Sequence, residues 1–229
     1  MTADLATAYR AWLVSPHPAR PHGAVAGAAV RRGLAQGTNL GNATRAAWAA
    51  LDEAWCQAPA TVWAWSDLHL FHANIIRYSG RPVADVASMN QQLLEAAQAC
   101  VAPTDWLLFG GDLSLGEELA TATWLTQCPG RKALILGNHD VDRQKLNRWK
   151  TVWSQFEAIA SVHALAATAR TPPLWCTHYP LGADRIPPGT RNVHGHIHQH
   201  VLAGPYLNLC VEQQGLRPVR LIDRLIPGP

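Results

Sequence analysis

The sequence has little charge of either sign. Only 15% of its 229 residues are charged, and the formal net charge is +3. Tight binding to nucleic acid depends on neutralising many phosphates with Lys and Arg, so a chain this close to neutral has no electrostatic basis for it. Nucleic acid is therefore a partner that the composition permits but does not favour.

The sequence also lacks long apolar runs and clustered cysteines. No stretch of 18 apolar residues occurs, so we expect no membrane span. The first five residues lack the basic start and apolar stretch of a signal peptide. The five cysteines are widely spaced without a C-x-x-C pair, which is typical of reduced, buried thiols and does not favour a structural zinc site. We expect a cytoplasmic protein.

Hydrophobic residues make up 48% of the chain, which is enough to build the core of one α/β domain with an appendage. Residues 1–58 are rich in Ala, Arg and Gly, and a cluster of prolines interrupts them. We expect an N-terminal helical extension over residues 1–58 and a main domain over residues 59–229.

The N-terminal extension has apolar residues at helical spacing but no cluster of candidate catalytic residues. Residues 42–55 carry an apolar stripe at helical spacing behind Asn42, a suitable N-cap, and residues 7–13 and 24–34 are further candidate helices. The favoured interpretation is that the extension packs on the main domain. The alternative is that its arginines shape the substrate site. These arginines are Arg31, Arg32 and Arg45.

Short apolar runs precede polar motifs along the main domain. The runs cover residues 61–65, 106–109, 133–136 and 174–176. Each is nearly continuous and bounded by Pro, Gly or charge, which is typical of a strand buried on both faces. Longer segments with helical periodicity separate the runs. This order predicts an α/β sheet with the polar motifs at the carboxyl ends of its strands.

Three amphipathic helices and two closing strands complete the expected main domain. Apolar side chains at three- and four-residue spacing predict helices over residues 82–100, 117–128 and 143–160. Two shorter apolar segments near the end of the chain, residues 206–211 and 218–222, predict the closing strands.

The polar motifs supply the oxygen and nitrogen ligands that divalent metals take in proteins. They read Asp67-Leu68-His69, Gly111-Asp112, Gly137-Asn138-His139-Asp140, His178 and Gly195-His196-Ile197-His198. A core strand running into a turn explains any single motif, but not the repeated choice of Asp, His and Asn. Five such motifs in order indicate a two-metal hydrolytic site.

Spacing suggests how these side chains are shared between two ions. Asp67 and His69 are two residues apart at a strand end, so a turn lets both converge on one ion. Asp112 is the natural bridge, because a carboxylate has two oxygens and offsets the charge of two cations. His196 and His198 share a face of an extended chain and can reach adjacent ions.

Taken together, the motifs D-x-H, G-D, G-N-H-D, H and G-H-x-H resemble the calcineurin-like metallophosphoesterase superfamily over residues 61–222. Residues 66–76 and 206–212 are similar to a small bacterial and phage branch of it. The resemblance implies a four-layer α/β/β/α sandwich and two metal-ligand sets. One set is Asp67, His69, Asp112 and His198. The other set is Asp112, Asn138, His178 and His196.

The resemblance also implies roles beyond metal binding. His139 matches the family's histidine that does not bind metal but donates a proton or hydrogen bond to the leaving oxygen. Asp140 is expected to orient that histidine. We expect two divalent ions per chain, with Mn²⁺ favoured over Fe, Zn, Ni or Co.

Side chains just beyond the first motif are weaker candidates. His72 and Asn74 are candidate substrate contacts, with a structural role as the alternative. Arg77 and Arg81 lie on the same segment and can meet a substrate anion, although a surface ion pair is the commoner fate of such residues.

The resemblance and the metal chemistry together predict a phosphoesterase in which a hydroxide bridging two ions attacks phosphorus in line. The favoured substrate is a small phosphodiester, nucleotide-like or cyclic. The alternatives are a nuclease or a phosphomonoesterase on the same site, or, from another class, a non-catalytic metal-binding module that keeps the fold.

Overall fold

The structure is a computed structural model that describes residues 41–141, 145 and 148–226. The two helices expected at the start of the chain lie outside this part, as do Arg31 and Arg32. Within the described part, no helix is long and apolar enough to cross a membrane.

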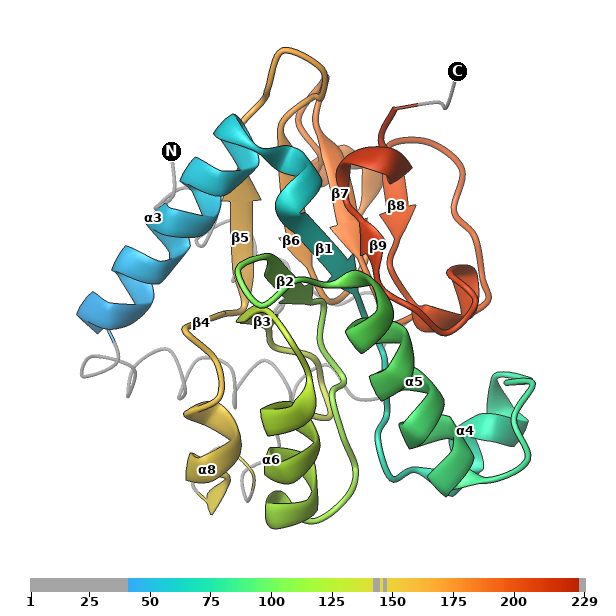
Figure 1. Ribbon diagram of the computed structural model, residues 1–229. Coiled ribbons are helices and arrows are strands. Elements are labelled where there is room, and N and C mark those ends of the chain that lie inside the picture. The colour runs from blue at the N-terminus through green and yellow to red at the C-terminus, as the bar shows by residue number, and fades with distance from the viewer. Residues whose placement is uncertain (1–40, 142–144, 146–147, 227–229) are drawn as a thin grey trace.

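Two β-sheets form the centre of the molecule (Figure 1). The first sheet has the strand order β4-β3-β2-β1-β9, and the second has the order β5-β6-β7-β8. The first sheet consists of β1 (Val62–Trp65), β2 (Trp106–Phe109), β3 (Arg131–Ile135), β4 (Ala158–Ala160) and β9 (Val219–Arg220). The second sheet consists of β5 (Val162–Leu165), β6 (Leu174–Thr177), β7 (Arg191–His194) and β8 (Tyr206–Asn208).

Most neighbouring strands run parallel. In the first sheet, β1, β2, β3 and β4 pair in parallel, and β9 joins β1 in the antiparallel sense. In the second sheet, β6, β7 and β8 are parallel, and β5 is antiparallel to β6. Parallel strands end at the same side of their sheet, so the loops that follow them are neighbours.

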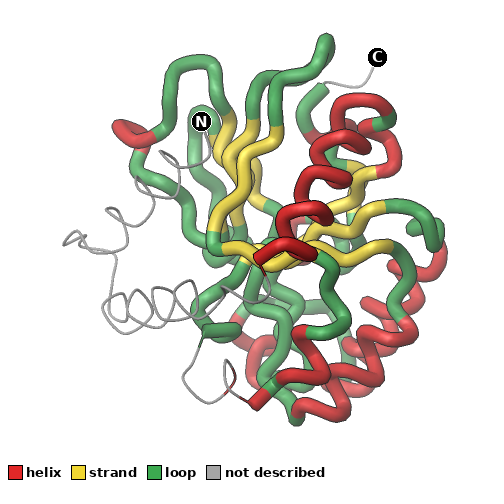
Figure 2. The backbone as a smooth tube through the Cα atoms, turned by 90° about the vertical axis from the view of Figure 1, so that its left-hand side faces the viewer, coloured by secondary structure: helices red, strands yellow, loops and turns green. Residues whose placement is uncertain are grey.

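Helices cover the first sheet and one flank of the sandwich (Figures 1 and 2). The helices are α3 (Gly41–Gln57), α4 (Ala73–Tyr78), α5 (Val86–Cys100), α6 (Glu118–Gln127) and α8 (Lys150–Trp153), with 3₁₀ turns at Pro59–Thr61, Ala183–Arg185, Val211–Gln213 and Ile222–Arg224. Side chains of α5, α6 and α8 pack on the first sheet, whereas α3 packs against β4 and into the core between the sheets. Asn42, the expected cap, lies inside α3, because Gly41 is already helical.

The continuous apolar run of β1 is explained by its burial on both faces. Trp63 and Trp65 face the helices and belong to the core beneath α5 and α6. Val62 and Ala64 point the opposite way, into the core that joins the two sheets. Successive side chains of a strand point to opposite faces, so a strand between two cores needs apolar residues at every position.

The helix expected over residues 143–160 is wrong as one continuous helix. Among the described residues of that span, Lys145, Arg148 and α8 (Lys150–Trp153) are helical, whereas Ala158–Ala160 form an edge strand paired with β3. Trp149 and Phe156 nevertheless both pack into the core beneath the first sheet. The apolar spacing therefore came from a short helix and the loop after it, which both bury side chains in the same core.

Two further boundaries differ from expectation. Helix α5 begins later than the expected residue 82, because Asp85 caps it by accepting a hydrogen bond from the backbone N–H of Ser88 at 2.7 Å. The closing strands expected over residues 206–211 and 218–222 are shorter, since β8 ends at Asn208 and a 3₁₀ turn follows.

Candidate metal centre

The polar motifs of both sheets come together beyond the carboxyl ends of their strands. The residues that follow β1, β2, β3, β6 and β7 are, in that order, Asp67 with His69, Asp112, Asn138 with His139, His178, and His196 with His198. The buried members are Asp67, His69, Asp112 and His178. The other members are half-buried, so the cluster opens toward solvent on one side.

Five of the predicted ligand residues have a left-handed backbone. Their φ angles are 59° at Asp67, 49° at His69, 52° at Asp112, 70° at His196 and 49° at His198. In the described part of the chain, only Phe71 and Leu216 share this conformation among residues other than glycine. Such backbones are costly and persist where the surrounding structure enforces them, which is typical of functional sites.

The first predicted ligand set is connected through three close pairs of donor atoms. Oδ1 of Asp67 lies 3.8 Å from Nε2 of His69 and 3.9 Å from Nε2 of His198. Oδ2 of Asp112 lies 3.6 Å from the same nitrogen of His69. Donor atoms that bind one ion at about 2.0–2.2 Å lie about 3–3.5 Å apart, so each pair would have to close slightly to share an ion.

The second predicted set shares Asp112 with the first. Oδ2 of Asp112 lies 3.4 Å from Nε2 of His178, which is itself 3.1 Å from Oδ1 of Asn138. Donor atoms of Asp112, His178 and His196 all lie within 4.8 Å of one another. A single carboxylate oxygen therefore stands between two groups of histidines.

The donor set fits divalent cations. Oδ1 of Asp67 and both ring nitrogens of His69 are buried and have no hydrogen-bond partner among the described residues. Leaving one buried polar group unsatisfied costs about 1–3 kcal/mol. A cation bound between Oδ1 of Asp67 and Nε2 of His69 would satisfy these two atoms, and nitrogen and carboxylate donors suit transition metals.

Hydrogen bonds fix which oxygen of Asp67 faces the cluster. Oδ2 accepts from the Ser66 hydroxyl at 2.6 Å, from the His196 backbone N–H at 2.9 Å and from the Cys210 thiol at 3.2 Å. Oδ1 is thus left as the donor atom toward an ion. Burial raises the pKa of Cys210 well above its usual value, so the thiol stays protonated and acts as a hydrogen-bond donor.

The structure gives Asp140 a backbone role. Its Oδ2 accepts from the N–H groups of Asp112 and Gly137, both at 2.8 Å, and its Oδ1 accepts from the Leu113 N–H at 3.0 Å. The expectation was that Asp140 orients the ring of His139. These hydrogen bonds tie the loop after β2 to the loop after β3, and the charge of Asp140 also acts to raise the pKa of His139.

His139 lies on the open side of the cluster. Its side chain is 44% exposed, and its Nε2 is 3.9 Å from Oδ2 of Asp112. Its backbone is held twice: its N–H donates to Oδ1 of Asp112 at 2.9 Å, and its carbonyl accepts from Nζ of Lys145 at 2.7 Å. Partial burial lowers the pKa of His139. The ring can therefore meet a molecule that enters from solvent.

The charges inside the cluster are strongly coupled. Burial alone would lower the pKa of His178, but the neighbouring carboxylates of Asp112 and Asp67 raise it to about 10. Burial and the charge of His178 lower the pKa of His196 to about 4. The carboxylates thus favour a proton on His178, and a cation bound at its ring nitrogen would compete with that proton.

The candidate substrate contacts lie at the rim. His72 precedes α4 and is half-buried, with its ring 5.7 Å from that of His69. Asn74 and Arg77 are exposed on α4. The guanidinium of Arg77 lies over the Tyr78 ring, 5.3 Å from its centroid.

Arg81 has a different position from the surface ion pair expected for it. Its side chain is fully buried and forms an ion pair with Glu212 at 2.7 Å. Ser66, Cys210 and Glu212 contact predicted ligands but do not belong to the polar motifs. Ser66 adjoins the first motif, but no local pattern connects that motif with residues more than 140 positions later.

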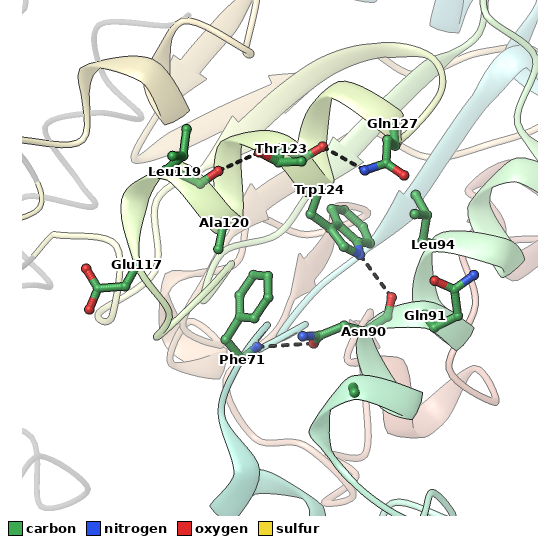
Figure 3. Close-up of a pocket in the computed structure, with 11 residues that line it drawn as sticks. Phe71, Asn90, Gln91, Leu94, Glu117, Leu119, Ala120, Thr123, Trp124 and Gln127 are labelled. Atoms are coloured by element: carbon green, nitrogen blue, oxygen red, sulfur yellow. Dashed lines mark hydrogen bonds between the residues drawn. The ribbon is translucent and has the colours of Figure 1, made fainter.

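A groove lies between α5 and α6 (Figure 3). It has a volume of about 660 Å³, and its lining contains none of the predicted ligands. Asn90 connects the two regions, because its side-chain oxygen accepts from the Phe71 N–H at 3.1 Å and its carbonyl accepts from the Trp124 indole N–H at 2.9 Å. The first bond holds the left-handed turn that follows His69.

Gly195→Ala is expected to weaken metal binding, because a Cβ on Gly195 would contact Ser66 Oγ and Asp67 Oδ2. Displacing groups that orient a ligand typically costs about 10–100-fold in metal affinity, and we expect that loss in a calorimetric titration with Mn²⁺. Gly189→Ala is the control: it has φ +77° and open space around its Cβ, so it should cost only about 1–2 kcal/mol of stability. Equal metal affinity of both variants would contradict the prediction.

Comparison with known proteins supports the family and the fold. A family model described as calcineurin-like phosphoesterase matches residues 60–224. The gene 66 protein of Mycobacterium phage L5 is 26% identical over 177 residues, covering 65% of this chain and 83% of that protein. The gene 66 protein of Mycobacterium phage D29 is 28% identical over 178 residues, covering 65% and 84%.

A solved structure shares the fold. The crystal structure of AQ665 from Aquifex aeolicus, a protein of unknown function, matches with a TM-score of 0.52 at 21% identity. The match covers 69% of this chain and 94% of that one. The two-sheet α/β fold predicted from the sequence is therefore confirmed.

Proposed function

The chain belongs to the calcineurin-like phosphoesterase family, and we propose that it is a metal-dependent hydrolase of phosphate esters. The observation that carries the proposal is the position of Asp112 Oδ2, 3.6 Å from Nε2 of His69 and 3.4 Å from Nε2 of His178. One carboxylate between two histidine-containing ligand sets is the arrangement that a pair of hydrolytic metal ions requires.

Two ligand sets would hold the ions. The first is Asp67, His69, Asp112 and His198. The second is Asp112, Asn138, His178 and His196. Bound there, divalent cations would supply a nucleophile from water at neutral pH and offset the negative charge of the phosphate ester.

The chain's own residues would carry the rest of the reaction. His139 presents an exposed ring beside Asp112 Oδ2, where Nε2 can donate a proton or hydrogen bond to the leaving oxygen. Asp140 and Lys145 hold the backbone on either side of that ring, since they bond to Gly137 N–H and to the His139 carbonyl. Holding the backbone in this way restricts the positions from which His139 can deliver a proton.

We propose a small phosphodiester, nucleotide-like or cyclic, as the substrate. The formal charge of +3 offers little attraction for a long polyanion, which argues against a nuclease. His72, Asn74 and Arg77 are the proposed contacts to the substrate, because His72 adjoins His69 and the other two are exposed on α4.

Metal removal tests this function. Protein stripped with a chelator should lose hydrolysis and regain it with Mn²⁺, and elemental analysis of the reconstituted protein should approach two metals per chain. The substrates to compare are nitrophenyl mono- and diesters, cyclic nucleotides and single-stranded oligonucleotides. Full activity in the continued presence of chelator would overturn the metal-dependent assignment, and faster cleavage of oligonucleotides or monoesters would overturn the substrate class.

A further inference from the structure

A buried arginine lies beneath the first motif. Arg81 donates from Nη2 to the carbonyl of Asp67 at 2.6 Å and from Nη1 to the carbonyl of Leu68 at 2.7 Å. Its Nε and Nη2 also donate to Oε1 of Glu212, at 3.0 and 2.7 Å. One guanidinium therefore joins the turn that carries Asp67 and His69 to a carboxylate far along the chain.

The same carboxylate oxygen holds a predicted ligand. Oε1 of Glu212 accepts from Nδ1 of His198 at 3.1 Å. With its proton on Nδ1, His198 presents the lone pair of Nε2 toward Oδ1 of Asp67, 3.9 Å away. Glu212 lies in the 3₁₀ turn that begins three residues after β8, and the Val211 N–H of that turn donates to the carbonyl of Ser66, just after β1, at 3.1 Å.

The second ligand set is oriented in a different way. Nδ1 of His178 donates to the backbone carbonyl of Gly110 at 2.9 Å, so its Nε2 faces Asp112 without help from a charged side chain. The contacts of Arg81 and Glu212 described above reach Asp67, Leu68 and His198 only. Among the predicted ligands, Arg81 and Glu212 therefore contact members of the first set only.

We propose that Arg81 and Glu212 are positioning residues that set the affinity of the Asp67–His69–His198 ion site independently of the His178–His196 site. The inference rests on the proposed two-metal centre but not on its activity toward any ester. The side chains of Arg81 and Glu212 can be substituted, whereas the backbone carbonyl of Gly110 that orients His178 cannot. Substitutions at Arg81 or Glu212 should therefore change the affinity of one ion site without changing that of the other.

Glu212→Gln is the sharpest test, because one atom changes. All three of the donors above use Oε1, and Oε2 is buried without a partner among the described residues, so an amide can keep the acceptor while the charge is lost. In calorimetric titration with Mn²⁺, one site should weaken by about 10–100-fold and the other should keep its wild-type affinity. Arg81→Lys should weaken the same site, since a single ammonium cannot reach all three acceptors.

Arg131→Lys is the matched control. Arg131 and Glu157 form an ion pair of 2.8 Å with both side chains substantially exposed, and the pair joins β3 to the segment before β4. This variant should bind both ions as the wild type does. Thermal unfolding of each metal-free variant checks that Glu212→Gln is folded, and metal retained after gel filtration gives the stoichiometry.

Equal weakening of both sites in Glu212→Gln, or unchanged affinity at both, would overturn the inference. A wild-type protein that takes up only one ion would also overturn it, whatever its activity. If the wild type binds two ions, loses one selectively in Glu212→Gln and still hydrolyses no ester, the inference stands and the proposed function fails.

Discussion

Asp112→Asn is expected to weaken both ion sites together and to abolish hydrolysis. The same oxygen, Oδ2, faces His69 at 3.6 Å and His178 at 3.4 Å, so neither ligand set is complete without it. Asparagine keeps the shape but loses the charge that offsets two cations. Metal-ion catalysis is worth several kcal/mol, so kcat/KM for a phosphodiester at a fixed Mn²⁺ concentration should fall by about three orders of magnitude or more.

His69→Ala is the comparison for this experiment, because His69 belongs to one ligand set. It should weaken one ion and leave the other close to its wild-type affinity in the same titration. If Asp112→Asn retained two ions at unchanged affinity, Asp112 could not occupy the shared position.

His139→Ala is expected to keep both ions and lose rate. The side chain is 44% exposed, and its backbone rather than its ring is held by Asp112 and Lys145, so truncation leaves the metal ligands in place. A positioned general acid typically contributes about 10²–10⁴-fold. The loss in kcat/KM should be largest for esters with poor, high-pKa leaving groups, because these depend most on protonation, and smallest for nitrophenyl esters.

The measurement is kcat/KM across leaving groups of graded pKa, with metal content determined alongside. His200→Ala serves as control, since His200 is an exposed histidine two residues after His198 and has no proposed role. An equal loss for every leaving group would assign His139 to positioning, and loss of an ion would make it a ligand.

The sequence predicted the strands that lie between two cores. The apolar run of residues 106–109 coincides with β2, because every side chain of that strand is buried. The apolar pattern did not predict the strand β7, because a buried polar residue interrupts it. Its centre holds Asn192, a buried amide that bonds to the Leu181 N–H at 2.8 Å and to the Trp175 carbonyl at 2.8 Å. A polar residue satisfied by tertiary contacts breaks the apolar pattern that identifies buried strands.

The convergence of the polar motifs also followed from the sequence, since parallel strands deliver their ends to one side of a sheet. The side chains that hold the ligands could not be predicted in the same way. Cys210 contacts Asp67 across 143 positions, and Glu212 contacts Arg81 across 131. Such pairs depend on how β8 and its turn pack beside β1, and no local spacing encodes that. The ligand assignments and the boundary near residue 58 stay predictions.

The proposed ligands are divided between the two sheets. Those that follow strands of the first sheet are Asp67, His69, Asp112 and Asn138, and those that follow strands of the second are His178, His196 and His198. Ions held between them would act as a non-covalent cross-link across the sandwich. Binding at a thousand times Kd adds about 4 kcal/mol to folding stability, provided the unfolded chain does not bind. The metal concentration would then determine how strongly the two sheets are held together at this end of the sandwich.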